Sequence, residues 1–206
     1  MQRRTSADDF AREFDVDVAQ FALRFIEPGV LAGKLGLNTI YPATDDELHT
    51  ELLELLVSVE TDMTIFYRHL AEIKTNMETH LIESGCENAI NQFSPAYYVK
   101  EQITPDYKSR LCLWLGRYIK RVKNDGTPDD IRQQRMNSLN PKYVLRNYLA
   151  QLAIDKAEQG DFSMVNELLE CLRKPYDEQP GKEEFAAKRP DWARQRAGCS
   201  MLSCSS

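Results

Sequence analysis

The sequence predicts an all-α protein, a bundle of about seven helices followed by an extended C-terminal tail. Apolar residues recur every three or four positions almost throughout, and strict alternation over five or more residues is hard to find. Proline, glycine and Asx residues interrupt this pattern at intervals that suit helix starts and stops. The 206 residues, 42% of them apolar, suffice for one or two hydrophobic cores. We therefore expect a helical domain over 1–173 and a tail over 174–206.

The first expected helix follows Ser6 and is broken at Glu27-Pro28-Gly29. Its apolar stripe consists of Phe10, Phe14, Val18, Phe21 and Phe25. Residues 30–42 read as a short apolar turn. Thr44-Asp45-Asp46-Glu47 has the form of a capping box and predicts the start of a second helix. A third helix is expected over 63–77, as an antiparallel neighbour of the second.

Residues 78–104 give no clear pattern, and the chain then returns to strong helix signals. Thr104-Pro105 predicts the start of a long helix that ends at Asn124-Asp125-Gly126. A short helix should follow Thr127-Pro128. Asn140-Pro141 predicts a helix that ends at Gly160, with a partner helix over 161–173.

The last part of the chain differs in composition from the rest. Prolines and charged residues dominate after Lys174, so this segment cannot form a core alone. Phe185 and Trp192 are the two side chains able to pin it to a surface, because each buries a large aromatic area.

Composition also limits the compartment and the partners. A net charge of -6 disfavours nucleic acid as a partner, since the whole molecule repels phosphate backbones. No apolar run approaches the ~20 residues of a membrane span, and the start lacks a secretory signal. An odd count of 5 scattered cysteines fits a reducing compartment better than a disulfide scaffold. We expect a cytoplasmic protein, or a mitochondrial one if the parent is eukaryotic, with no membrane partner.

No motif in the sequence predicts a complete catalytic site. The nearest approach to a phosphate-binding loop, Gly29 to Leu35, has one residue too few between its glycines and no preceding strand, so we interpret it as a turn. The three histidines, His49, His69 and His80, form no metal-binding pair. We therefore expect no catalytic, cofactor-binding or metal-binding residue in this chain.

Two charged patterns allow a functional and a structural interpretation. The pairs Asp8-Asp9, Asp45-Asp46 and Asp129-Asp130 could serve acid-base chemistry, but each falls in the first turn of an expected helix, where carboxylates stabilise the free amides. The basic stretch of Arg117, Lys120, Arg121 and Lys123 beside Trp114 and Tyr118 could bind an anion. The same position, a helix C-terminus, favours a solvated helix end.

The tail cysteines are the remaining candidate chemistry. Cys199 and Cys204 lie in a segment that we expect to be exposed, where a thiol can be oxidised or can exchange disulfides. Their spacing matches no oxidoreductase motif, and Cys204 is not the fourth residue from the end that prenylation would need.

Several segments resemble the C-terminal part of the selenoprotein O (YdiU) family. The most specific run from Asn137 to Gln151, from Arg189 to Ala193 and from Ser203 to Ser206. Supporting segments follow the family's order: Lys34–Leu37, Glu51–Leu56, Asp62–Arg68, Gly160-Asp161 and Leu172–Tyr176. The residues that carry the signature are Asn140, Pro141, Arg146, Asn147, Pro190 and Trp192.

The resemblance implies a function for the parent protein. Full members of the family are similar to protein kinases but transfer AMP from ATP to hydroxyl side chains of proteins, using Mg²⁺. Their kinase-like core precedes the region that this chain resembles, and the glycine-rich loop, lysine-glutamate pair and metal-binding residues of such a core are not found here. A truncated gene, a start assigned too late or a deliberately shortened chain would each give this sequence.

The family's terminal cysteine or selenocysteine implies a regulatory role for Cys204, in contact with the kinase-like core. In this chain Cys204 is then free, paired with Cys199 or available to another molecule. We expect an inactive helical module whose partner is the kinase-like core of its parent, with exposed apolar faces that favour self-association. The alternative is a stand-alone protein-interaction module, because 141–159 and 161–173 look like one helical repeat unit.

Overall fold

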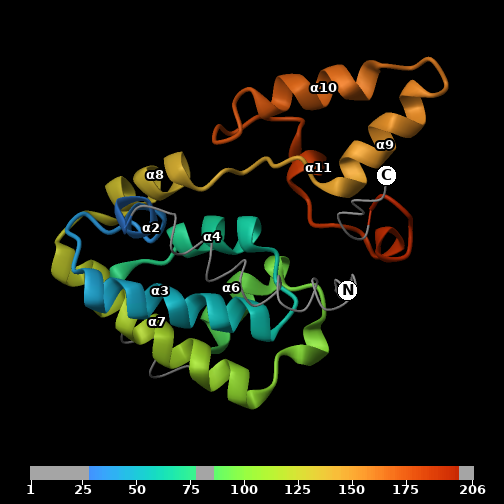
Figure 1. Cartoon of the computed structure of the whole chain (residues 1–206). Coiled ribbons are helices and arrows are strands. Elements are labelled where there is room, and N and C mark those ends of the chain that lie inside the picture. Colours follow the sequence, from blue (N-terminus) through green and yellow to red (C-terminus); the bar gives the residue numbers. More distant parts are fainter. Residues whose placement is uncertain (1–27, 78–85, 200–206) are drawn as a thin grey trace, which may run out of the picture.

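The computed structural model describes residues 28–77 and 86–199 (Figure 1). Regular structure in these ranges is helical, which confirms the predicted fold class. The α-helices are α2 (Pro28–Lys34), α3 (Pro42–Ser58), α4 (Met63–Ala71), α6 (Glu87–Phe93), α7 (Pro105–Asp125), α8 (Asp129–Leu139), α9 (Asn147–Ala157), α10 (Ser163–Leu172) and α11 (Glu183–Ala186). Short 3-10 helices are η1 (Thr75–Met77), η2 (Ser94–Ala96), η3 (Lys100–Gln102) and η4 (Asp191–Arg194). The first expected helix lies outside the described residues.

Buried apolar residues form two separate clusters, which define two lobes. The first cluster draws on residues between Ala32 and Met136, and the second on residues between Tyr143 and Cys199. We call residues 28–139 the first lobe and residues 143–199 the second lobe. In Figure 1 the second lobe, with α9, α10 and α11, stands apart from the body that carries α3 and α7. The division into domains at 173/174 stays a prediction, although residues on both sides of it share the second cluster.

Helix α7 is the centre of the first lobe. The Trp114 and Tyr118 rings stack with their centroids 5.2 Å apart, and both side chains are fully buried. The Trp114 indole donates to the Leu48 carbonyl at 2.7 Å, and the Tyr118 hydroxyl donates to the Leu35 carbonyl at 3.0 Å. These bonds let two polar atoms enter the core without an unpaired donor. They also tie α7 to α2 and α3.

Start and stop signals located most helix ends. Thr104 caps α7 by accepting from the Tyr107 amide at 3.2 Å, and Gly126 ends it in the left-handed conformation at φ 71. Gly160 likewise follows α9 with φ 83. These positions agree with the sequence predictions.

Five helix predictions were wrong in detail. The third helix was expected over 63–77, but α4 ends at Ala71 and the separate 3-10 helix η1 covers Thr75–Met77. Residues 28–34 form a helix instead of a turn, and α3 begins at Pro42, two residues before the supposed cap at Thr44. The expected pairing of the second and third helices is replaced by other partners, since α3 packs mainly on α7 and α4 on α8. Asn140-Pro141 does not open a helix, because α9 begins at Asn147.

Candidate functional site

Charged residues join the two lobes, and one family-signature residue, Arg146, takes part in this contact. We call the set the lobe junction; it comprises Glu60, Asp62 and Tyr98 from the first lobe and Arg146, Arg189 and Arg194 from the second. Glu60 and Asp62 lie between α3 and α4, and Tyr98 follows η2. The antiparallel bridge of Thr61 with Tyr97 holds these two segments together.

Asp62 is the most deeply buried acid of the junction. Its carboxylate caps α4 by accepting from the Ile65 amide at 3.1 Å and also accepts from the Tyr98 hydroxyl at 2.9 Å. The Arg146 guanidinium pairs with both carboxylate oxygens, with Nη2 at 3.2 Å from Oδ1. The Asp62 and Arg146 side chains are only 2% and 11% exposed. Such a bidentate, desolvated pair fixes the direction in which α9 leaves the first lobe.

Glu60 receives two arginines from the tail. Arg189 and Arg194 approach its two carboxylate oxygens at 2.6 and 2.7 Å. The same two guanidinium groups lie over the Tyr98 ring, 5.0 and 5.9 Å from its centroid. Burial, with the nearby Asp62 charge, raises the pKa of Tyr98, so its hydroxyl stays protonated and donates to Asp62.

A second polar contact crosses from α4 to the start of the tail. The Arg68 guanidinium donates to the carbonyls of Asn137 and Tyr176, both at 3.3 Å, and pairs with Glu178 at 2.5 Å. Lys142 pairs with the same glutamate.

The structure brings only part of the signature set together. Arg146 joins the junction, while Asn140 ends α8, where its amide donates to the carbonyls of Lys34 and Met136, both at 3.0 Å. Pro141 lies in the connector between the lobes and Asn147 is the first residue of α9. Pro190 caps η4, beside Arg189, and Trp192 follows within η4.

A groove on the second lobe contains two of these signature residues. Its cavity volume is about 380 Å³, and its wall includes α9, α10, α11, Pro190 and Trp192. Phe185 is buried, as expected for a residue that pins the tail, but Trp192 is 48% exposed. The Tyr148 ring meets the Trp192 ring edge-on at 6.3 Å.

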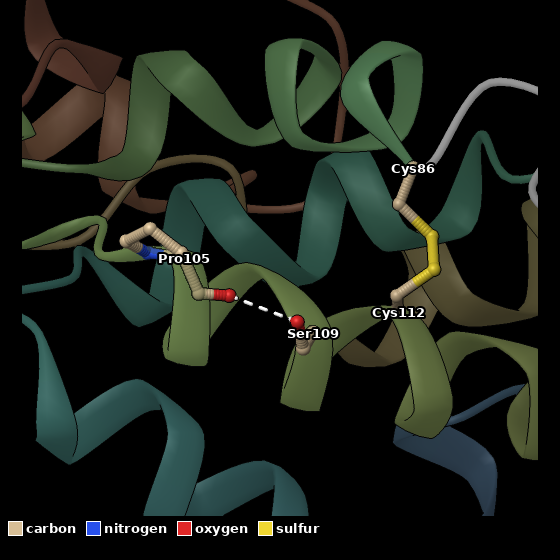
Figure 2. Close-up of a disulfide and its surroundings, with 4 residues drawn as sticks. All are labelled: Cys86, Pro105, Ser109 and Cys112. Carbon is tan, nitrogen blue, oxygen red and sulfur yellow. Dashed lines mark hydrogen bonds between the residues drawn. A yellow bond between two sulfur atoms is a disulfide. The ribbon is translucent and has the colours of Figure 1, made fainter.

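The cysteines differ most from the sequence predictions. Cys199 was expected to be exposed and is instead 3% exposed in the second cluster, and Cys204 lies outside the described residues. Cys86 and Cys112 form a disulfide between the start of α6 and α7, with Cα atoms 5.7 Å apart (Figure 2). No sequence signal predicted this pair, which joins residues 26 positions apart on different helices.

The charged patterns have structural partners where they are described. Arg121 is buried against Asp45, its Nε 2.7 Å from the carboxylate, and Arg117 pairs with Glu51. Asp129 accepts from the Thr75 amide at 3.0 Å and from Arg132 at 3.1 Å. These contacts favour the structural interpretation of the basic stretch and of two acidic pairs.

Neither metal ligands nor membrane spans emerge from the described ranges. Within 28–77 and 86–199, no three His, Cys, Asp or Glu side chains converge as metal ligands would. None of the helices in the same ranges has the length and apolar character that crossing a bilayer requires.

Comparison with known proteins places this helical chain in a family. The family model described as "Protein adenylyltransferase SelO" matches residues 11–173. A protein nucleotidyltransferase YdiU of Rhodopirellula baltica is 55% identical over 86% of this chain, which covers 33% of that relative. The YdiU proteins of Nitrosospira multiformis and Aromatoleum aromaticum are 44% and 46% identical over 97% of this chain, and 38% and 34% of their lengths are covered. The chain thus spans about a third of the length of these relatives, and it belongs to the SelO family.

Proposed function

We propose that this chain is the helical C-terminal part of a protein nucleotidyltransferase that transfers AMP from ATP to protein hydroxyl groups. In the parent it supports a kinase-like core, which supplies the ATP and Mg²⁺ sites, and alone it transfers no AMP. The observation that carries the proposal is the family match over residues 11–173 combined with coverage of only a third of the relatives.

The use of charged residues in the described part agrees with a supporting role. Two deeply buried carboxylates pair with arginines that are distant in the sequence, Asp62 with Arg146 and Asp45 with Arg121. Tight pairing holds these groups in fixed positions between helices, which suits a scaffold.

The test is complementation in trans. The chain, the remaining two thirds of the Rhodopirellula baltica relative and an equimolar mixture of both are incubated with Mg²⁺ and a labelled ATP analogue, and label on protein is measured. We expect no label with the chain alone and label with the mixture above that of the core alone. AMP transfer by the purified chain, above a heat-treated control, would contradict the proposal.

A second candidate, a stand-alone interaction module, is favoured by one observation. Helix α10 exposes Phe162, Val165 and Leu169, at three- and four-residue spacing, with exposed fractions of 58%, 41% and 51%. An apolar stripe of this kind suits a protein partner or self-association. Light scattering measures self-association, and a pulldown against the full-length relative measures binding to the kinase-like core. Binding to the core supports the first function, and absence of binding to the core supports the second.

We also propose that the protein acts in the cytoplasm, the compartment that the sequence analysis expects. It should have no nucleic-acid partner, since its net charge is -6. Fractionation of cells that express the parent protein tests the compartment. Salt-dependent binding to RNA would contradict the second statement.

A further inference from the structure

The described chain ends beside the groove on the second lobe. Cys199 is buried in the second cluster, together with Leu149 of the groove wall. Just before it, Gly198 runs so close to α9 that a Cβ there would lie 2.2 Å from Gln151 Oε1. Arg196 pairs with Asp155, one turn further along the same helix. Cys199 therefore lies against α9, in the apolar cluster on which the groove residue Leu152 packs.

The groove offers a surface for apolar side chains. Its wall combines aliphatic and aromatic residues with charged ones. The apolar and aromatic lining includes Tyr148, Leu152, Met164, Phe185 and Trp192. Trp192 keeps about half of its surface exposed there, although Arg196 lies over its ring at 5.8 Å and Tyr148 meets its edge. An indole left half covered in a concave apolar site gains from a further apolar contact.

We propose that the groove binds Met201 and Leu202 of this same chain. They are the only large apolar residues in 200–206, the segment Ser-Met-Leu-Ser-Cys-Ser-Ser. A chain extends by at most ~3.6 Å per residue, so Met201 and Leu202 lie within ~7 and ~11 Å of Cys199. At ~1.5 Å of rise per residue, the groove residues Leu149 and Leu152 lie within one turn of Gln151 on α9, which is inside this reach.

The docked segment fixes the place of the redox candidate Cys204. Cys204 lies two positions after Leu202, so this placement holds the Cys204 backbone within ~7 Å of the docked Leu202. The groove thus acts as the anchor that determines which partners the thiol can meet. This inference does not depend on AMP transfer by the parent.

Acrylamide quenching of tryptophan fluorescence tests the contact in the full chain. Trp114 is 1% exposed and Trp192 is 48% exposed, so quenching reports on Trp192. In the variant Met201→Ser/Leu202→Ser we expect the quenching constant to rise by about two-fold, because the indole loses an apolar cover. The matched control Ser205→Ala/Ser206→Ala, in the same tail, should have the same quenching constant as the unsubstituted chain. Equal quenching in all three proteins would overturn the proposal.

Crosslinking provides the second measurement. A diazirine amino acid at position 202 should crosslink within the chain to peptides containing Tyr148–Lys156 or Phe185–Trp192, and the same group at position 206 should do so far less. Crosslinks elsewhere in the chain, or crosslinked dimers that show a second copy in the groove, would refute the assignment. Circular dichroism confirms that each variant keeps its helices.

Discussion

Replacing Arg146 with glutamine should loosen the attachment of the second lobe. The substitution leaves the Asp62 carboxylate, 2% exposed, without the one cationic partner that it has among the described residues. Loss of one member of a buried ion pair costs about 3 to 5 kcal/mol. The Ile65 amide and the Tyr98 hydroxyl still donate to Asp62, so we expect a loss near the lower limit, about 3 kcal/mol.

A double-mutant cycle measures this loss. Urea unfolding is measured for the unsubstituted chain, for Arg146→Gln, for Asp62→Asn and for the double variant. The double variant should be about 2 kcal/mol more stable than the sum of the two single losses predicts. The matched control is Arg196→Gln, which removes an arginine 41% exposed from its pair with Asp155 and should destabilise the chain far less than Arg146→Gln does. Equal losses for Arg146→Gln and Arg196→Gln would refute the reasoning.

Three further variants test other parts of the fold. Burial, with the charge of Lys34, lowers the pKa of His49 from 6.5 to about 4. The contribution of His49 to the free energy of unfolding is therefore complete above pH 6.5 and falls by about 3 kcal/mol as the pH drops to 4. In His49→Gln, the urea midpoint should depend less on pH between 6.5 and 4. Gly36→Ala should lower the free energy of unfolding, measured by thermal unfolding, by about 3 kcal/mol, because Gly36 has φ 76 and a Cβ there would lie 2.6 Å from the Arg132 side chain. The control Gly126→Ala, where φ is 71 but the space around the Cβ is open, should lower it by only about 1 kcal/mol. Reduction of the Cys86–Cys112 bond should cost about 3 kcal/mol, as expected for a loop closed over 26 residues, and dithiothreitol should leave the melting temperature of a Cys86→Ser/Cys112→Ser variant unchanged.

Local signals predicted what depends on a few neighbouring residues. The cap at Thr104 and the left-handed stops at Gly126 and Gly160 each follow from backbone chemistry within one turn, and all three were located. Within α3, Leu52 and Leu56 are buried at the four-residue spacing of one helix face. Periodicity reports which face of a helix is buried.

Contacts between distant residues were not predictable in the same way. Asp45 was interpreted as part of a cap, but its main partner is Arg121, 76 residues away. The preference for helix after Asn140-Pro141 was overridden because Asn140 instead ends α8 and Lys142 turns toward Glu178. Sequence spacing contains no information about such pairs, and the lobe junction was missed for this reason.

The tail shows why composition alone underestimates order. Residues 174–199 contribute only three fully buried apolar residues, Phe185, Ala193 and Cys199, which cannot form a core by themselves. Helices α9 and α10 bring an incomplete core, and these three side chains complete it. Burial of Cys199 follows directly, because the segment that looked free is the third layer of the second lobe. A thiol held in that layer is shielded from oxidants, which argues against Cys199 and leaves Cys204 as the redox candidate that we propose.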